Sequence, residues 1–330
     1  MTTIHCSAHA RAGLLGNPSD GFFGKTISLE IRNFTAQAIL QPSSNLELIP
    51  GPDDLCRYES IHALVDNVKR HGLYDGMRIV KAAVKRFADY CAENGIALRG
   101  DNFTLGYETN IPRQVGMAGS SAIITAVFRT LMQFYEVDIP REVLPGLIMR
   151  VETEEVGIQA GLQDRVIQVY GGMVYMDFDR SHLESHGYGR YEPLDRSILP
   201  PLYLAYRTDH GEDSGVYHSN LKARWDAGDS EIVDAMRGFG AITDRGRACL
   251  EAGDVGGFSD CMDENFDLRA KITTLDPKNA RMVEVARGVG VPGKFAGSGG
   301  AVIGVCEDDT VFARLVEAFR EIDCEVIRPD

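Results

Sequence analysis

The patterns that indicate strands and helices fall in groups along this chain of 330 residues and do not alternate strictly. Apolar residues alternate over residues 27–40, which predicts strands with one buried face. Residues 76–94, 120–135 and 143–157 carry apolar side chains at helical spacing, and helices follow one another again from about residue 215. Such grouping is typical of an α+β fold and argues against a doubly wound parallel sheet.

Further strands and a polar junction divide the chain into two expected domains. Short apolar runs predict strands at 102–112, 173–178, 200–207, 294–306 and 324–329, and helical spacing predicts a last helix over about 309–321. Residues 181–201 are polar, contain Gly and Pro and have little periodicity, as is typical of a domain junction. We therefore expect an N-terminal domain over residues 1–195 and a C-terminal domain over residues 196–330.

The charge and the cysteines of the chain exclude several classes of partner and binding site. The formal net charge is −14, so nucleic acid and anionic membranes are poor partners. Seven cysteines are scattered without a Cys-x-x-Cys motif, which argues for reduced thiols and against a disulfide framework or a zinc site. The N-terminal residues lack a signal-peptide pattern, and no apolar run approaches membrane-spanning length. We therefore expect a cytoplasmic protein.

Three motifs that resemble binding sites have the wrong context. Residues 19–26 (SDGFFGKT) end like a phosphate-binding loop, but Ser19 stands where the first glycine belongs, and a strand pattern follows where a helix is needed. Residues 288–293 (GVGVPG) match a dinucleotide-binding pattern but follow a helix, which makes them a helix end and a turn. His182 and His186 lie four residues apart in a loop-like segment without a further ligand cluster, so we interpret them as surface histidines.

Residues 110–123 (NIPRQVGMAGSSAI) have the context that those motifs lack. A strand leads into this small-residue loop, and a strongly apolar helix follows it. Backbone N–H groups between Gly116 and Ser121 can therefore converge on an anion, and the helix dipole adds to the attraction. Ser120 and Ser121 can cap the helix, and one of their hydroxyl groups could also bind Mg²⁺. The alternative is an ordinary serine cap behind a glycine turn.

Two further segments favour a phosphoryl-transfer site over that alternative. Glu152 lies on an expected helix and Asp164 at a glycine-flanked turn. Transfer of a phosphoryl group needs one carboxylate that holds Mg²⁺ and another that orients or deprotonates the acceptor hydroxyl group. Residues 294–302 (KFAGSGGAV) form a second small-residue loop in a strand context, where a ligand could approach the backbone; a β-bulge or a tight hairpin is the alternative.

Together these segments resemble the motifs of the GHMP superfamily of sugar and mevalonate kinases. The three motifs of that superfamily are similar to ARAGLLGNPSD at residues 10–20, PRQVGMAGSSA at residues 112–122 and AGSGGAV at residues 296–302. This chain has Met117 and Ala118 where the superfamily has Leu and Gly in its second motif. The register of the serines is therefore open, and either Ser120 or Ser121 is the expected Mg²⁺ ligand.

Within the superfamily, strings along almost the whole chain resemble the glucuronokinases, among them GLLGNPSD, TNIPRQ, AGLQDR and KFAGSGGAV. This resemblance implies a ribosomal-protein-S5-like N-terminal domain and a ferredoxin-like α/β-plait C-terminal domain. It also implies ATP and Mg²⁺, and phosphorylation of the anomeric hydroxyl group of D-glucuronate by a monomer or homodimer. The alternatives are another sugar (galacturonate, galactose, arabinose or a heptose phosphate) or a non-catalytic nucleotide-binding regulator.

The resemblance also implies roles for individual residues. Asp164 is the expected catalytic base, with Arg11 beside it to lower its pKa and face the transferred phosphoryl group. Glu152 is the expected metal ligand. The phosphate groups of ATP are expected to contact Pro112, Gly116, Ala118, Gly119, Ser120 and Ser121. The sugar is expected to contact Asn17, Asp20, Gly297, Ser298 and Gly299, with Ser214 and His218 as further candidates.

The carboxylate of glucuronate demands a cation or several hydrogen-bond donors, because burying it unpaired is costly. Arg113 and Arg165 each flank a motif and are the first candidates, followed by Lys25 and Arg269. Arg165 could instead form a structural ion pair beside the base. The sequence does not choose among these residues.

Overall fold

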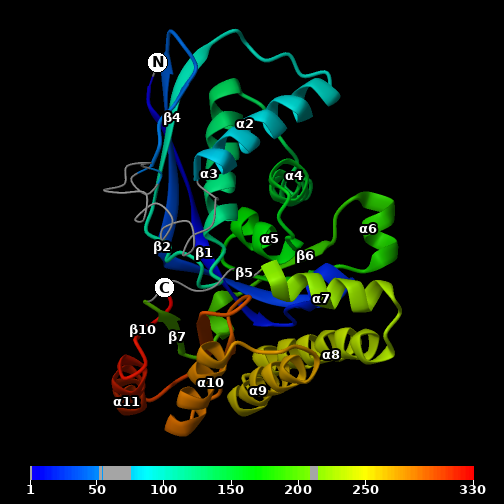
Figure 1. Cartoon of the computed structure of the whole chain (residues 1–330), viewed down its shortest axis with the longest axis vertical. Coiled ribbons are helices and arrows are strands. Elements are labelled where there is room, and N and C mark those ends of the chain that lie inside the picture. Colours follow the sequence, from blue (N-terminus) through cyan, green and yellow to red (C-terminus); the bar gives the residue numbers. More distant parts are fainter. Residues whose placement is uncertain (1, 52–53, 55–75, 209–214) are drawn as a thin grey trace, which may run out of the picture.

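The computed structural model describes residues 2–51, 54, 76–208 and 215–330. These residues form two β-sheets, one from the N-terminal part of the chain and one from the C-terminal part, each with helices packed on it (Figure 1). Strands and helices are grouped and the sheets are largely antiparallel, so the α+β prediction is confirmed.

The first sheet has the strand order β3-β4-β2-β5-β6, with β1 paired to β2. The long strand β2 pairs with β5 along its first part and with β4 along its last part, while β1 runs beside most of it. All described pairs are antiparallel except β3 with β4. The strands are β1 (Ile4–Leu15), β2 (Lys25–Ser43), β3 (Glu47–Leu48), β4 (Asn102–Thr109), β5 (Met173–Asp177) and β6 (Arg190–Leu194).

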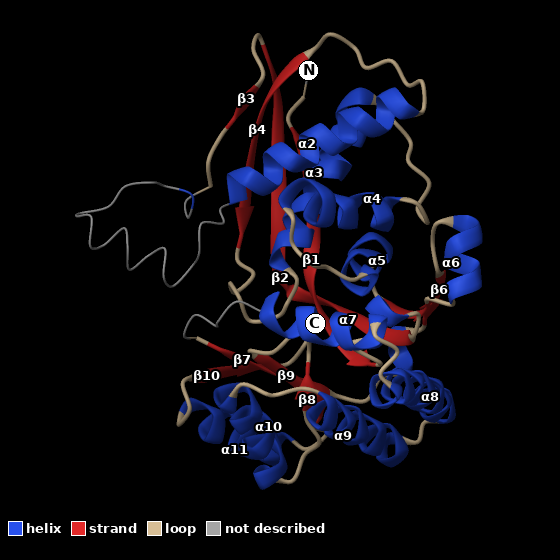
Figure 2. Ribbon diagram, turned by 45° about the vertical axis from the view of Figure 1, so that its right-hand side comes forward, coloured by secondary structure: helices blue, strands red, loops and turns tan. Residues whose placement is uncertain are grey.

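Helices cover one face of the first sheet (Figures 1 and 2). The central one, α3, is apolar nearly all round, and almost every residue from Ser121 to Leu131 is buried, as expected for a helix enclosed by neighbours. A π-helical turn, η3 (Val151–Val156), continues α4 and leads towards α5. The helices of this face are α2 (Gly76–Glu93), α3 (Gly119–Tyr135), α4 (Leu144–Arg150) and α5 (Leu162–Tyr170).

The second sheet is antiparallel with the order β10-β7-β9-β8. Its strands are β7 (Leu202–Arg207), β8 (Lys294–Phe295), β9 (Ala301–Val305) and β10 (Cys324–Ile327). The C-terminal helices are α7 (Gly215–Asp226), α8 (Ser230–Ala252), α9 (Val255–Ile272), α10 (Pro277–Val289) and α11 (Asp309–Arg320). An aspartate side chain accepts a backbone N–H at the start of each of the last four helices, namely Asp229, Asp254, Asp276 and Asp308.

Two segments differ from the sequence prediction. Residues 4–15, for which no element was predicted, form β1, whose buried alanines alternate with larger side chains over its first part. Residues 181–201, expected to be irregular, contain most of α6 (Arg180–His186) and the strand β6, with a short 3₁₀ turn η4 (Arg196–Ile198). No residue of α6 is buried, so apolar periodicity could not reveal it. His182 and His186 therefore stack on a helix and do not lie in a loop.

The two glycine-containing motifs set aside in the sequence analysis have the local structure that was predicted for them. Residues 19–26 form a 3₁₀ turn, η1 (Ser19–Phe22), and then enter β2, while Gly290 ends α10 within the GVGVPG motif. Six cysteines are free thiols, and Cys56 lies outside the described residues. Among the helices of the described ranges, none is both long and apolar enough to cross a membrane.

Candidate active site

Two small-residue loops pack against each other at the site, the first over residues 110–118 and the second over residues 296–300. A Cβ atom on Gly116 would lie 2.6 Å from the carbonyl oxygen of Gly299, and one on Gly297 would lie 2.1 Å from that of Gly116. These distances leave no room for a side chain, and Gly116 also has a φ of 68°. The contact between the loops therefore requires these glycines, whereas the sequence analysis explained them by the approach of a ligand.

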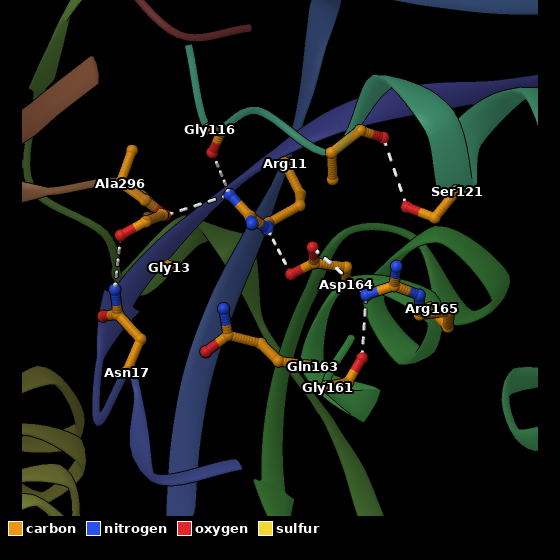
Figure 3. A network of polar contacts seen from close by, with 12 residues as sticks. Arg11, Gly13, Asn17, Gly116, Ser121, Gly161, Gln163, Asp164, Arg165 and Ala296 are labelled. Carbon is orange, nitrogen blue, oxygen red and sulfur yellow. Dashed lines mark hydrogen bonds and ion pairs between the residues drawn. The ribbon is translucent and has the colours of Figure 1, made fainter. Parts of the chain in front are cut away.

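Arg11 joins both loops to the start of α5. Its Nη1 donates to the carbonyl oxygens of Gly116 at 2.6 Å and Ala296 at 3.0 Å, and its Nε donates to Oδ1 of Asp164 at 2.6 Å (Figure 3). The arginine lies on β1 and is only 5% exposed. Asp164 lies in the first turn of α5, which begins at Leu162, so the expectation of a turn at this aspartate is wrong.

Glu152 forms a second charged pair beside the first. Its side chain is 2% exposed, and Oε2 accepts hydrogen bonds from Nε of Arg165 at 2.9 Å and from Nη2 of the same arginine. Its Oε1 accepts a hydrogen bond from the hydroxyl group of Ser120 at 2.6 Å. Nη1 of Arg165 also lies 3.4 Å from Oδ2 of Asp164. We term Glu152, Asp164, Arg11 and Arg165 the carboxylate cluster, in which each carboxylate is held by an arginine.

The helix α3 begins beside this cluster without a side-chain cap. Its N-cap residue is Ala118, whose backbone is left-handed with a φ of 62°. Ser121 donates to the carbonyl oxygen of Ala118 at 3.2 Å and Ser120 donates to Glu152, so the prediction that a serine caps α3 is wrong. The helix starts at Gly119, which places both serines inside the first turn. No described side chain accepts a hydrogen bond from the first N–H groups of α3, so these groups can donate hydrogen bonds to an anion.

Asp20 lies on η1 and contacts the start of α5. Its Oδ2 accepts a hydrogen bond from the backbone N–H of Gln163 at 3.3 Å, and a Cβ atom on Gly161 would lie 2.0 Å from the same oxygen. Burial of the carboxyl group, together with the negative charge of Asp164, raises the pKa of Asp20 to about 6. Asp20 therefore exchanges its proton closer to neutral pH than an ordinary aspartate does.

The second loop is held by cations that bind uncharged oxygen atoms. Lys294 of β8 is 1% exposed, and its Nζ donates to the carbonyl oxygens of Gly13 at 2.6 Å and Phe295 at 2.8 Å and to Oδ1 of Asn17 at 2.6 Å. Burial lowers the pKa of Lys294 well below its usual value, as do the nearby charges of two arginines, while the three acceptors match the three protons of an ammonium group. Within the described residues, Lys294 has no acidic partner.

Arg269 completes this arrangement from α9. Its Nη1 donates to the carbonyl oxygen of Gly297 at 2.6 Å, and its Nη2 donates to that of Ser298 at 2.8 Å. Nδ2 of Asn17 also donates to the carbonyl oxygen of Gly297, at 3.4 Å. We term Lys294 and Arg269, with the oxygen atoms that they hold, the carbonyl clamp. It fixes the second loop against β1 and the turn that follows it.

Comparison with known proteins identifies the family to which this geometry belongs. Residues 78–172 match the GHMP kinases N terminal domain, and residues 247–322 match GHMP kinases C terminal. The chain is 45% identical over 320 residues to Glucuronokinase 1 of Arabidopsis thaliana, which covers 95% of this chain and 88% of that protein. The chain belongs to the GHMP kinase family.

A second relative supports this membership, and a solved structure shows the same fold. Probable glucuronokinase 2 of Arabidopsis thaliana is 46% identical over 315 residues, or 93% of this GHMP kinase and 86% of that protein. The crystal structure of the Methanococcus jannaschii mevalonate kinase superposes with a TM-score of 0.73 over 100% of this chain and 99% of that one, at 17% identity. The predicted two-domain GHMP kinase fold is thus confirmed.

The cations considered for an acidic substrate of this GHMP kinase differ in their surroundings. Arg165 binds Glu152 and also donates to the carbonyl oxygen of Gly161 at 2.8 Å, which is the structural ion pair that the sequence left as an alternative. Lys25 donates to Asp244 at 2.7 Å, and Arg269 belongs to the carbonyl clamp. Arg113 is exposed in the first loop, next to Pro112. Ser214 lies outside the described residues, and His218 lies on α7.

Two residues of the site were missed by the sequence analysis. Lys294 opens the string KFAGSGGAV, and a lysine at the start of an otherwise apolar strand was the available signal. Gln163 directly precedes Asp164 and is 2% exposed. No pattern in the sequence distinguishes this glutamine, because its importance depends on what surrounds its side chain.

The described residues include no group of three or more His, Cys, Asp or Glu side chains that could hold a metal ion. Ser120 and Glu152 nevertheless place a hydroxyl and a carboxylate oxygen within 2.6 Å of each other. Oxygen atoms of this kind suit Mg²⁺, which in kinases takes one or two protein ligands and completes its coordination with water and substrate phosphates. The pair therefore fits a Mg²⁺ ion that arrives with a nucleotide.

Proposed function

We propose that this GHMP kinase transfers the γ-phosphoryl group of ATP to the anomeric hydroxyl group of D-glucuronate, giving glucuronate 1-phosphate and ADP. The observation that carries the proposal is the carboxylate cluster beside the uncapped start of α3. Phosphoryl transfer relies on positioning and on positive charge around the phosphate groups, and this arrangement offers both. The 45% identity to Glucuronokinase 1 over most of both chains supports the choice of sugar.

Asp164 is the proposed base. Its Oδ1 accepts a hydrogen bond from Arg11, which orients the carboxylate, and the carboxylate accepts the proton of the anomeric hydroxyl group. The oxygen of that hydroxyl group forms the new bond to the γ-phosphorus, the bond to the bridging oxygen breaks, and ADP leaves. Arg11 also faces the first loop, so its charge can stabilise the transferred phosphoryl group.

The phosphate groups of ATP are proposed to lie against the first loop and the first turn of α3, formed by Pro112, Gly116, Ala118, Gly119 and Ser120. Free N–H groups and the helix dipole attract an anion there. Ser120 and Glu152 would hold Mg²⁺, which when bound neutralises part of the phosphate charge. Ser121 is fully buried and donates its hydroxyl group to Ala118, so we propose Ser120 as the metal ligand and a structural role for Ser121.

The sugar is proposed to lie between Asn17, Asp20 and the loop residues Gly297, Ser298 and Gly299. For its carboxylate we propose Arg113, because this arginine is exposed at the first loop, whereas Arg165 is buried. We also propose that the domain boundary lies at residues 195/196, between β6 and β7, and that the enzyme acts in the cytoplasm, where its free thiols stay reduced.

Release of ADP in the presence of ATP and Mg²⁺ tests this proposal. The panel of acceptors comprises D-glucuronate, D-galacturonate, galactose, arabinose and a heptose phosphate, and phosphorus NMR of the product shows which hydroxyl group is phosphorylated. We expect glucuronate to be the best acceptor and C1 to carry the phosphate group. Equal activity on uncharged hexoses would contradict a carboxylate-reading site, and the absence of ADP release with every sugar would favour a nucleotide-binding regulator.

A further inference from the structure

The amide group of Gln163 lies in the candidate site. Its side chain is 2% exposed, and its buried Oε1 has no hydrogen-bond partner among the residues that the structure describes. Within the described residues, Nε2 of Gln163 makes no hydrogen bond either, and only the backbone N–H is bonded, to Asp20. Figure 3 shows the amide pointing into the space between Asn17, Arg11 and Asp164.

An unpaired buried amide is costly, since burying such a group without a compensating hydrogen bond opposes folding. Gln168, on the same helix and equally buried, also has an Oε1 without a partner among the described residues, but its Nε2 donates to the carbonyl oxygens of Ala118 at 2.8 Å and His9 at 3.3 Å. Gln163 lacks such contacts although it lies five residues away. A polar group left unpaired beside a catalytic carboxylate is suited to a ligand that supplies the missing hydrogen bond.

Neighbouring residues leave space beside this amide. A Cβ atom on Gly13 would lie 3.1 Å from Nε2 of Gln163 and 3.2 Å from Oδ1 of Asn17, so a side chain at position 13 would press on both groups. The carbonyl clamp fixes Asn17 through Lys294, and Asp20 fixes the backbone of Gln163. Both amides thus face the same side of Gly13 on β1.

We propose that Gln163 contacts the substrate and accepts a hydrogen bond from the hydroxyl group on C2 of the sugar. This inference rests on the proposed function, in which Asp164 takes the proton from the C1 hydroxyl group. The groups next to C1 are the ring oxygen, which only accepts hydrogen bonds, and the C2 hydroxyl group, which also donates. The unpaired Oε1 needs a donor, so the C2 hydroxyl group is the neighbour that satisfies it. Gln163 would then select sugars that carry this hydroxyl group.

Kinetics with a deoxy sugar test the contact directly. We compare the wild-type enzyme with Gln163→Met, using D-glucuronate and 2-deoxy-D-glucuronate as acceptors. Removal of the C2 hydroxyl group should lower kcat/KM of the wild type by at least about 10-fold, because the amide is then left unpaired in the complex. In Gln163→Met the same removal should change kcat/KM by less than about 3-fold, because the partner is already absent. KM for ATP should stay unchanged.

Two controls separate this contact from a role in folding. The unfolding temperature of ligand-free Gln163→Met should be no lower than that of the wild type, since an apolar side chain replaces an unpaired amide. Gln133→Met, an identical substitution at an exposed position on α3, should leave all kinetic constants unchanged. A lower unfolding temperature, wild-type kcat/KM of Gln163→Met on glucuronate, or an equal loss from the deoxy sugar in both enzymes would overturn the proposal.

An error in the proposed substrate can be distinguished from an error in the proposed contact of Gln163. A wild-type enzyme that turns over another sugar of the panel, and not glucuronate, contradicts the assigned substrate alone. The comparison is then repeated with that sugar and its 2-deoxy analogue, and the same loss in the wild type and its absence in Gln163→Met would support the contact. Equal losses in both enzymes would overturn it.

Discussion

Buried positive charges hold both sides of the candidate site, but they hold different groups. In the carboxylate cluster, Arg11 and Arg165 pair with Asp164 and Glu152, which can exchange protons or bind a metal ion. In the carbonyl clamp, Lys294 binds backbone and amide oxygen atoms, which cannot ionise. The difference separates two tasks, because the carboxylates of the cluster can take up a proton or a metal ion during a reaction, whereas the oxygen atoms that the clamp binds only fix the shape of the second loop.

The energetic basis of the two regions differs accordingly. A buried carboxylate and its arginine compensate each other's charge, so neutralising the carboxylate leaves the arginine as an uncompensated buried charge and lowers stability. A buried lysine without an acidic partner is compensated only by its hydrogen bonds, and its removal leaves three acceptors without donors. Substitutions in the cluster should therefore affect the rate of reaction as well as stability, and substitutions in the clamp should affect stability and substrate binding.

The largest effect is expected for Asp164→Asn. Asparagine keeps the size of the side chain and an oxygen that can accept the hydrogen bond from Arg11, but it cannot take the proton of the acceptor hydroxyl group. We expect kcat to fall by about 10³-fold or more, with nearly unchanged nucleotide affinity. Stopped-time ADP assays and calorimetric titration with ATP measure both quantities. Normal turnover would show that Asp164 is not the base, and the proposed difference in task between the carboxylate cluster and the carbonyl clamp would then fail.

Lys294→Met should show the opposite profile. Loss of the three hydrogen bonds leaves the oxygens of Gly13, Asn17 and Phe295 unpaired, and we expect the free energy of unfolding to fall by about 3 kcal/mol. Asn17 loses the donor that fixes its amide, so KM for the sugar should rise more than kcat falls.

Lys25→Met is the matched control for this substitution. Lys25 is partly exposed and pairs with Asp244, so its loss should cost less than about 1 kcal/mol. Urea unfolding measures both variants. If Lys294→Met is no less stable than Lys25→Met, the carbonyl clamp does not stabilise the second loop.

Residue types and local patterns allow the α+β fold to be predicted, because α2 and the long strand β2 carry strong apolar periodicity. The exposed helix α6 carries none and was missed. The contact of Arg11 with Asp164 joins residues 153 positions apart, so only the resemblance to a family, and no spacing, could suggest it. The serine cap was wrongly predicted because the left-handed Ala118 is the N-cap, two residues before Ser120, and sequence rules favour a serine as a cap. Lys294 and Gln163 gain their importance from tertiary neighbours alone.

The two serines of α3 offer a matched pair of substitutions that tests which of them acts with the carboxylate cluster. Ser120 donates to Glu152, whereas Ser121 donates to the carbonyl oxygen of Ala118 inside the helix. We expect Ser120→Ala to lower kcat/KM by about 10- to 100-fold, because it removes one proposed Mg²⁺ ligand, and to raise the Mg²⁺ concentration needed for half-maximal rate. Ser121→Ala should change both values by less than about 3-fold. Equal effects of the two substitutions, measured in a Mg²⁺ titration, would contradict the assignment of Ser120.

The smallest effect concerns Asp20, which faces the cluster but has no arginine bonded to it among the described contacts. Its pKa is raised to about 6 in the folded protein, first by burial and then by Asp164, against about 3.9 in the unfolded chain. Between about pH 4 and pH 6 the folded state therefore binds more protons than the unfolded state, so ionisation of Asp20 lowers stability as pH rises through this window. Asp20→Asn removes this loss of stability, because asparagine does not ionise. The unfolding temperature of the variant should equal that of the wild type near about pH 4, exceed it by a growing amount up to about pH 6, and exceed it by a constant amount above about pH 7. A constant difference at all these pH values would show that Asp20 is as well compensated as the carboxylates of the cluster, and the distinction drawn between them would fail.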